Sequence, residues 1–133
     1  MIGIDTNILV RYIVQDEPAQ ARAATHFVER VLSKATPGFV NRVVLCELVW
    51  VLESGYGYTR EQIAATLQRL FEIDRIRLES PDLNWRALDA YRHGIDFSDA
   101  LIALINVSMD CEHTVSFDRR AARFEKIKLL AQK

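Results

Sequence analysis

Cysteine is scarce in this chain of 133 residues, and so are long apolar runs. Its two cysteines, Cys46 and Cys111, have no ligand partner at short spacing, which argues against a disulfide framework or a zinc site. We expect both thiols to be buried, as suits a reducing cytoplasm. No apolar run approaches the roughly 20 residues that cross a bilayer. The chain begins in a strand-like segment without a basic leader, so we expect neither membrane insertion nor secretion.

Net charge is also low, at −1. The chain therefore lacks the overall positive charge that is typical of many nucleic-acid binders. A polyanion would have to be bound by local arginines and by metal. The three prolines and five glycines fall between periodic segments, and no linker or repeat is visible. We therefore expect one domain over residues 1–133.

The remaining pattern alternates short apolar strands with amphipathic helices. Helices are expected at 7–15, after Pro18, at 42–54 behind an Asn41 N-cap, at 63–71, at 82–91 and from 98 or 99 to about 109. Strands are expected at 2–4, where burial is also expected, and at 39–40, 76–78, 114–117 and 127–130. This order predicts an α/β fold with a mostly parallel sheet and helices on both of its faces.

Two acidic residues directly follow predicted strands. Asp5 ends the first strand and Asp118 ends the strand at 114–117. In open parallel sheets, the ligand crevice lies beyond the carboxyl ends of the strands, which is where these side chains fall. The alternative for each is simple capping, of the helix after Asp5 and of the segment 119–124 after Asp118.

Two more acids occur in apolar helices. Every residue of 43–52 other than Glu47 is apolar or aromatic, so we expect Glu47 to be buried and therefore paired, protonated or bound to metal. The alternative is a salt bridge to a core arginine. Asp99 opens the apolar run 99–105, where the helix dipole is the alternative explanation, although Asp96 and Ser98 already offer capping oxygens.

We expect these four acids to lie together, where their mutual repulsion requires a cation. An all-carboxylate set favours Mg²⁺ or Mn²⁺ over zinc. The histidines lack ligand spacing and are expected to be ordinary surface or satisfied residues. Five arginines near the acidic segments are candidates for holding phosphates, with ordinary surface charge as the alternative: Arg11, Arg42, Arg119, Arg120 and Arg123.

Four short motifs, at 4–7, 41–52, 96–103 and 115–118, give the chain a family resemblance. In order and spacing, the sequence resembles the PIN-domain family, and specifically the VapC-type toxins of bacterial and archaeal toxin–antitoxin pairs. Each motif is unspecific alone, and the combination covers essentially the whole chain.

The resemblance implies a PIN-like three-layer α/β/α sandwich that cleaves RNA with Mg²⁺ or Mn²⁺. It implies that Asp5 and Asp99 are the main metal ligands and that Glu47 and Asp118 support them, directly or through water. A metal activates water for in-line attack on the phosphate, so no Ser–His or Cys–His nucleophile is required.

The resemblance also implies supporting residues and partners. Asn7 and Ser116 match positions that orient the acidic shell, although Ser116 stands where the family often has threonine. Asp96 is a possible fifth acid without an assigned role. A cognate antitoxin would silence the enzyme in its acidic groove, and the toxin would form a homodimer. The segments 43–52 and 56–58 could supply apolar surface for these contacts, with core packing as the alternative.

Two other function classes compete with this interpretation. A haloacid-dehalogenase-type phosphotransferase needs a second aspartate where this chain has Asn7. A receiver domain needs paired acids before its first-strand motif and a late lysine, and neither is evident. A non-catalytic module that only binds RNA or protein is disfavoured by the complete set of acids.

Overall fold

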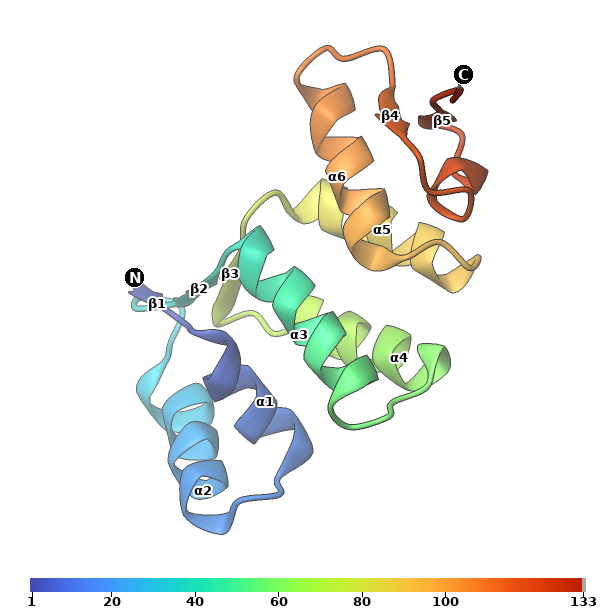
Figure 1. The fold of residues 1–133 in the computed structure, drawn as a ribbon. Coiled ribbons are helices and arrows are strands. Elements are labelled where there is room, and N and C mark those ends of the chain that lie inside the picture. Colours follow the sequence, from blue (N-terminus) through green and yellow to red (C-terminus); the bar gives the residue numbers. More distant parts are fainter. Residues whose placement is uncertain (133) are drawn as a thin grey trace. The chain divides into compact units, whose positions relative to one another are not determined.

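The computed structural model describes residues 1–132 and divides into two compact units, Met1–Ser80 (unit 1) and the remainder from Pro81 (unit 2). Each unit contains parallel strands and helices, which Figure 1 shows in the colours of the sequence. The expected α/β class with a parallel sheet is confirmed. No helix of residues 1–132 has both the length and the apolar composition that a membrane crossing requires.

The sheet of unit 1 has the strand order β1-β2-β3, with β1 at Ile2–Gly3, β2 at Gly38–Val40 and β3 at Ile76–Leu78. All neighbours are parallel, and Gly38 is paired with Ile2 on one side and with Ile76 on the other. Within this unit β1 is an edge strand, so Ile2 and Gly3 are exposed and only Ile4 is buried. The expectation of a buried first strand is wrong for that reason.

Five helical segments connect these strands along the chain of unit 1. Asn41 caps one of them as expected, because its side chain accepts a hydrogen bond from Val44 N at 2.9 Å. Thr59 and Gln62 form a capping box at the start of another. The segments are α1 (Thr6–Val14), α2 (Pro18–His26), a π-helix (Phe27–Val31), α3 (Arg42–Ser54) and α4 (Arg60–Phe71).

Gln15 ends α1 in the left-handed conformation, at φ 61°. Its side-chain amide donates hydrogen bonds to the carbonyl oxygens of Arg11 and Tyr12, at 3.3 and 2.8 Å, and to the Thr25 hydroxyl at 3.1 Å. Thr25 belongs to α2, which runs beside α1 in Figure 1. One side chain therefore caps α1 and ties it to α2.

The core of unit 1 is built largely from leucine and isoleucine on the inward faces of α1, α3 and α4. Burying each such side chain contributes about 1.5–3 kcal/mol. α3 contributes one continuous stripe, which holds the helix in place and leaves its opposite face outside this core. The fully enclosed residues include Leu9, Leu45, Leu48, Leu52, Ile63 and Leu67.

Unit 2 packs two helices together with a two-stranded parallel sheet. Tyr91 and Phe97 meet edge to face where the helices join, with ring centroids 6.4 Å apart, and Gly94 makes the turn between them at φ 97°. Small residues on the second helix, Ala100 and Ala103, are fully buried. The elements are α5 (Pro81–Arg92), α6 (Phe97–Ser108), β4 (Thr114–Ser116), a short 3₁₀ turn (Ala121–Arg123) and β5 (Ile127–Leu129).

Candidate active site

Asp5 lies at the junction of β1 and α1, as the sequence predicts. It is exposed and forms the N-cap of α1: its Oδ1 accepts a hydrogen bond from Thr6 N at 2.8 Å. The capping role that competed with function is therefore real. It occupies one carboxylate oxygen, and no described Lys, Arg or His of unit 1 forms an ion pair with Asp5.

Glu47 lies on α3 and is exposed in unit 1, so the expectation of a buried carboxylate is wrong. α3 buries only the stripe that includes Val44 and Leu48, and its opposite face carries Val43 and Trp50, which are 64% and 67% exposed. Sequence alone suggests burial because the neighbours are apolar, but two of them are themselves solvent-exposed in this unit. The alternative, a salt bridge from Glu47 to an arginine, is not present among the described residues of unit 1.

Thr6 brings Glu47 and Asp5 together. Its buried hydroxyl donates a hydrogen bond to Glu47 Oε1 at 2.7 Å, while its amide donates to Asp5. Two acids that are 42 positions apart in the chain thus share one partner. They line a cavity of about 350 Å³ whose walls are formed by Asp5, Thr6, Asn7, Val10, Arg11, Glu47, Val51 and Tyr56.

Arg11, one of the five candidates for holding phosphates, is half-buried at this cavity and already has hydrogen-bond partners. Its Nε donates to Gln20 Oε1 at 2.7 Å, and its Nη1 donates to Asp16 Oδ1 at 3.2 Å and to the Tyr56 hydroxyl at 3.0 Å. The hydrogen bond with Tyr56, followed by the charge of Asp16, raises the pKa of Arg11. Sequence reasoning missed Asp16, and it placed Tyr56 only in the 56–58 segment proposed for partner contacts, not at this cavity.

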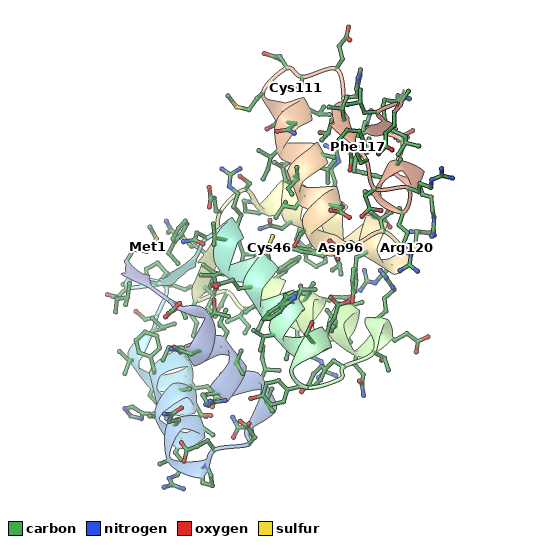
Figure 2. All side chains as sticks on the ribbon, in the orientation of Figure 1. Met1, Cys46, Asp96, Cys111, Phe117 and Arg120 are labelled. Atoms are coloured by element: carbon green, nitrogen blue, oxygen red, sulfur yellow. The ribbon has the colours of Figure 1, made fainter. Side chains whose placement is uncertain are left out.

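In unit 2, Asp99 lies in the first turn of α6. Asp96, which is labelled in Figure 2, is the N-cap of this helix. Asp96 Oδ2 accepts a hydrogen bond from Asp99 N at 3.1 Å, which gives the fifth acid a structural role. Partial burial of Asp99, together with the negative charges of Asp96 and Asp118, raises the pKa of Asp99. No described Lys, Arg or His of this unit forms an ion pair with Asp99. The carboxylate is therefore electrostatically uncompensated.

Asp118 follows β4 and is exposed. Its Oδ1 accepts hydrogen bonds from Arg120 N at 2.8 Å and Ala121 N at 3.3 Å, so it caps the 3₁₀ turn as the alternative interpretation expected. The Ser116 hydroxyl accepts a hydrogen bond from Asp118 N at 3.0 Å. Ser116 thus holds the backbone of the turn rather than the carboxylate itself.

The other candidate arginines differ in availability. Arg42 is held by Glu79, with Nη2 2.6 Å and Nε 2.7 Å from Oε2, and these bonds lower the pKa of Glu79. Arg42 is therefore a structural residue at the start of α3. Arg119, Arg120 and Arg123 are exposed and form no ion pair within the described part of unit 2.

The remaining sequence expectations concern cysteine and histidine. Cys46 is half-buried and Cys111 is exposed, so the expectation of two buried thiols is wrong, because Cys111 follows the end of α6. Neither forms a disulfide within residues 1–132. All three histidines, His26, His93 and His113, are exposed, as expected.

The donors at both acidic groups fit a hard divalent ion. They are carboxylate oxygens, and neither group has a cationic side chain paired with it in its own unit. Within residues 1–132, no three Asp, Glu, His or Cys side chains gather as a complete ligand set. Mg²⁺ keeps several waters and is commonly bound through only one or two carboxylates. The residues therefore suit Mg²⁺ or Mn²⁺ better than zinc.

The structure thus places the predicted residues in two groups. Asp5, Asn7 and Glu47 belong to unit 1, and Asp96, Asp99, Ser116 and Asp118 belong to unit 2. That all four principal acids act together stays a prediction.

Comparison with known proteins covers both groups. A family model described as "PIN domain" matches residues 2–127, a span that includes every candidate acid. The chain is 29% identical over 119 residues to a protein named "VapC ribonuclease" from Aquifex aeolicus (strain VF5), an alignment that covers 88% of this chain and 87% of that protein. With strand-end acids, parallel strands and a family match over almost its entire length, the chain belongs to the PIN-domain family.

Proposed function

We propose that this protein is a metal-dependent endoribonuclease that hydrolyses RNA phosphodiester bonds and acts as the toxin of a type II toxin–antitoxin pair. Membership of the PIN-domain family and the similarity to a VapC ribonuclease support the reaction class. The observation that carries the proposal is the presence of two uncompensated acidic groups, one around Thr6 and one around Asp99.

In this proposal, Asp5 and Asp99 are the main ligands of Mg²⁺ or Mn²⁺, and Glu47 and Asp118 support them. Such an ion supplies Lewis-acid activation of water and neutralises charge on the scissile phosphate. All four acids serve one reaction, although two belong to each unit. We keep residues 1–133 as a single PIN-like nuclease domain, which the span of the family match supports.

The chain's own residues then orient these acids. The Thr6 hydroxyl fixes one oxygen of Glu47, and the Asp96 cap fixes the backbone of Asp99 at the start of α6. Ser116 holds the turn that carries Asp118. Asn7 is assigned to the same supporting role because it lines the cavity with Asp5 and Glu47.

The proposal includes a cognate antitoxin, a homodimer and a cytoplasmic location. The exposed Val43 and Trp50 of α3 support a protein contact, because they are apolar and uncovered in unit 1. A second cavity of this unit, of about 810 Å³, has Tyr58 in its wall together with Ile13, Leu70 and Ile73. The segments 43–52 and 56–58, which the sequence analysis proposed for partner contacts, therefore each have apolar or aromatic side chains that are not fully buried.

The test is cleavage of cellular RNA by the purified protein, with cut sites mapped by sequencing. We expect cleavage with Mg²⁺ or Mn²⁺, no cleavage with EDTA, and a loss of at least about 100-fold in kcat/KM for Asp5→Asn, or about 3 kcal/mol of transition-state stabilisation. Asp82→Asn is the matched control, since Asp82 is an exposed aspartate in the first turn of α5.

Two results would overturn the proposal. Cleavage that survives both EDTA and Asp5→Asn would exclude a metal-dependent reaction. Tight RNA binding without cleavage in any metal would favour a non-catalytic binding module instead.

A further inference from the structure

The cavity that contains Asp5 and Glu47 has a second chemical character. Besides the acids, its walls include the guanidinium-bearing Arg11, the aromatic Tyr56 and the apolar Val51. Metal binding by the two carboxylates does not require an arginine, an aromatic ring or an apolar side chain in the same cavity. The cavity measures about 350 Å³, and ligand sites for small molecules begin at about 300 Å³.

Tyr56 is held in position from both ends of its side chain. Its backbone lies in the turn after α3, where a Cβ at Gly55 would approach Val51 O to 2.9 Å and Gly57 adopts φ 66°. At the other end, its hydroxyl donates to Asp16 Oδ2 at 2.9 Å and accepts from Arg11. The aromatic ring is therefore preorganised, and its hydroxyl needs no partner from a ligand.

Arg11 is fixed by the same contacts but keeps donor capacity. Asp16, Gln20 and Tyr56 engage its Nε and Nη1. Its Nη2 has no hydrogen-bond partner among the described residues of unit 1. A guanidinium held on one edge and available on the other is suited to an anionic oxygen, such as one of a phosphate.

We infer that this cavity is a subsite for one nucleotide of single-stranded RNA, in which Tyr56 stacks on the base and Arg11 contacts a phosphate next to the acidic group. This inference rests on the proposed function. Unstacked bases are commonly bound on aromatic side chains, and such stacking tolerates different sequences. A nucleotide bound in this subsite would place the RNA backbone next to Asp5 and Glu47.

Tyr58 offers a matched control. It is two residues from Tyr56 and equally half-buried, but it lines the separate 810 Å³ cavity. Tyr56→Leu should raise KM for a short single-stranded RNA about tenfold, with kcat changed by less than about threefold, because it removes a stacking contact made in the bound state as well as the transition state. Tyr58→Leu should leave both constants near wild type.

Tyr56→Phe separates the ring from the hydroxyl. It keeps the stacking surface and loses the contacts to Arg11 and Asp16, so KM should rise less than in Tyr56→Leu. Equal KM values for Tyr56→Leu and wild type, or equal losses in Tyr56→Leu and Tyr58→Leu, would overturn the assignment.

A binding measurement tests the nucleotide subsite without relying on RNA cleavage or on the folding of Tyr56→Leu. Fluorescence anisotropy is measured for Asp99→Asn protein with Mg²⁺ and a fluorescein-labelled mixed-sequence RNA, and then with an oligonucleotide of equal length that has abasic ribose throughout. We expect the base-bearing RNA to bind about tenfold more tightly. Equal affinity would overturn the nucleotide subsite. Absence of RNA cleavage by the wild-type protein, with base discrimination retained, would overturn the proposed reaction and leave the subsite standing.

Discussion

Thr6 does more at the candidate site than its position in the sequence suggests. As the first residue of α1, it donates its amide to the cap and its hydroxyl to an acid from another helix. It was not singled out from sequence because a threonine after a strand-end aspartate is equally expected at any helix start. Asp5, in contrast, could be located from sequence, since a strand end and a cap are local features.

Asp99 provides a prediction at the same scale. Its pKa is raised, so folding stabilises the protonated form of Asp99 relative to the unfolded chain, and the free energy of unfolding falls as pH rises from the ordinary value of 3.8 through the raised one. Asparagine resembles the protonated carboxyl group. Asp99→Asn should therefore have a higher Tm than wild type in EDTA at neutral pH, and the gap should close as pH falls toward 3.8.

Thermal unfolding monitored by circular dichroism measures this difference, with Asp82→Asn as the surface control. A lower Tm for Asp99→Asn at neutral pH in EDTA would contradict the electrostatic account, because it would mean that the ionised carboxylate stabilises the metal-free fold.

Helices and strands were the most predictable level of this structure. The helix at 42–54 and the strand at 76–78 agree with α3 and β3 residue for residue, since both arise from local periodicity and capping. The exposure of Glu47 was not predictable. It depends on which face of α3 meets the core of unit 1, and an almost uniformly apolar helix does not encode that choice. The network of Asp16 and Tyr56 was missed because it joins residues 40 positions apart.

The N-cap of α3 offers a test at the scale of an element. Asn41→Ala removes the acceptor for Val44 N and should destabilise the protein by about 1 kcal/mol. Asn41→Ser retains a capping oxygen and should cost only a small part of that. Urea denaturation gives both free energies of unfolding. Unchanged stability of Asn41→Ala would show that the cap contributes nothing to stability.

At the scale of the whole molecule, the family match runs through both compact units, from residue 2 to residue 127. The three-layer arrangement expected from sequence is a property of the family, and each unit has parallel strands of its own. Composition and charge predicted neither a membrane-spanning helix nor an overall basic surface, and they could not indicate whether acids far apart in sequence act together.

Joint action of the units can be tested through metal binding. A ligand that binds the folded state at 100 times its Kd stabilises that state by about 2.7 kcal/mol, so Mg²⁺ should raise the Tm of the wild-type protein. Asp5→Asn and Asp99→Asn should each remove most of this shift, and Asp82→Asn should retain it. A full Mg²⁺ shift in either Asp5→Asn or Asp99→Asn would show that the acids of one unit suffice.

Gln15 has a consequence for how such a protein can diversify. Its amide pins α1 to Thr25 of α2, and both residues border the 810 Å³ cavity rather than the one that holds the acids. The wall that these two residues form contains none of the candidate acids. Substitutions at Gln15 and Thr25 should therefore alter the shape of the 810 Å³ cavity without changing any residue that lines the cavity with Asp5 and Glu47.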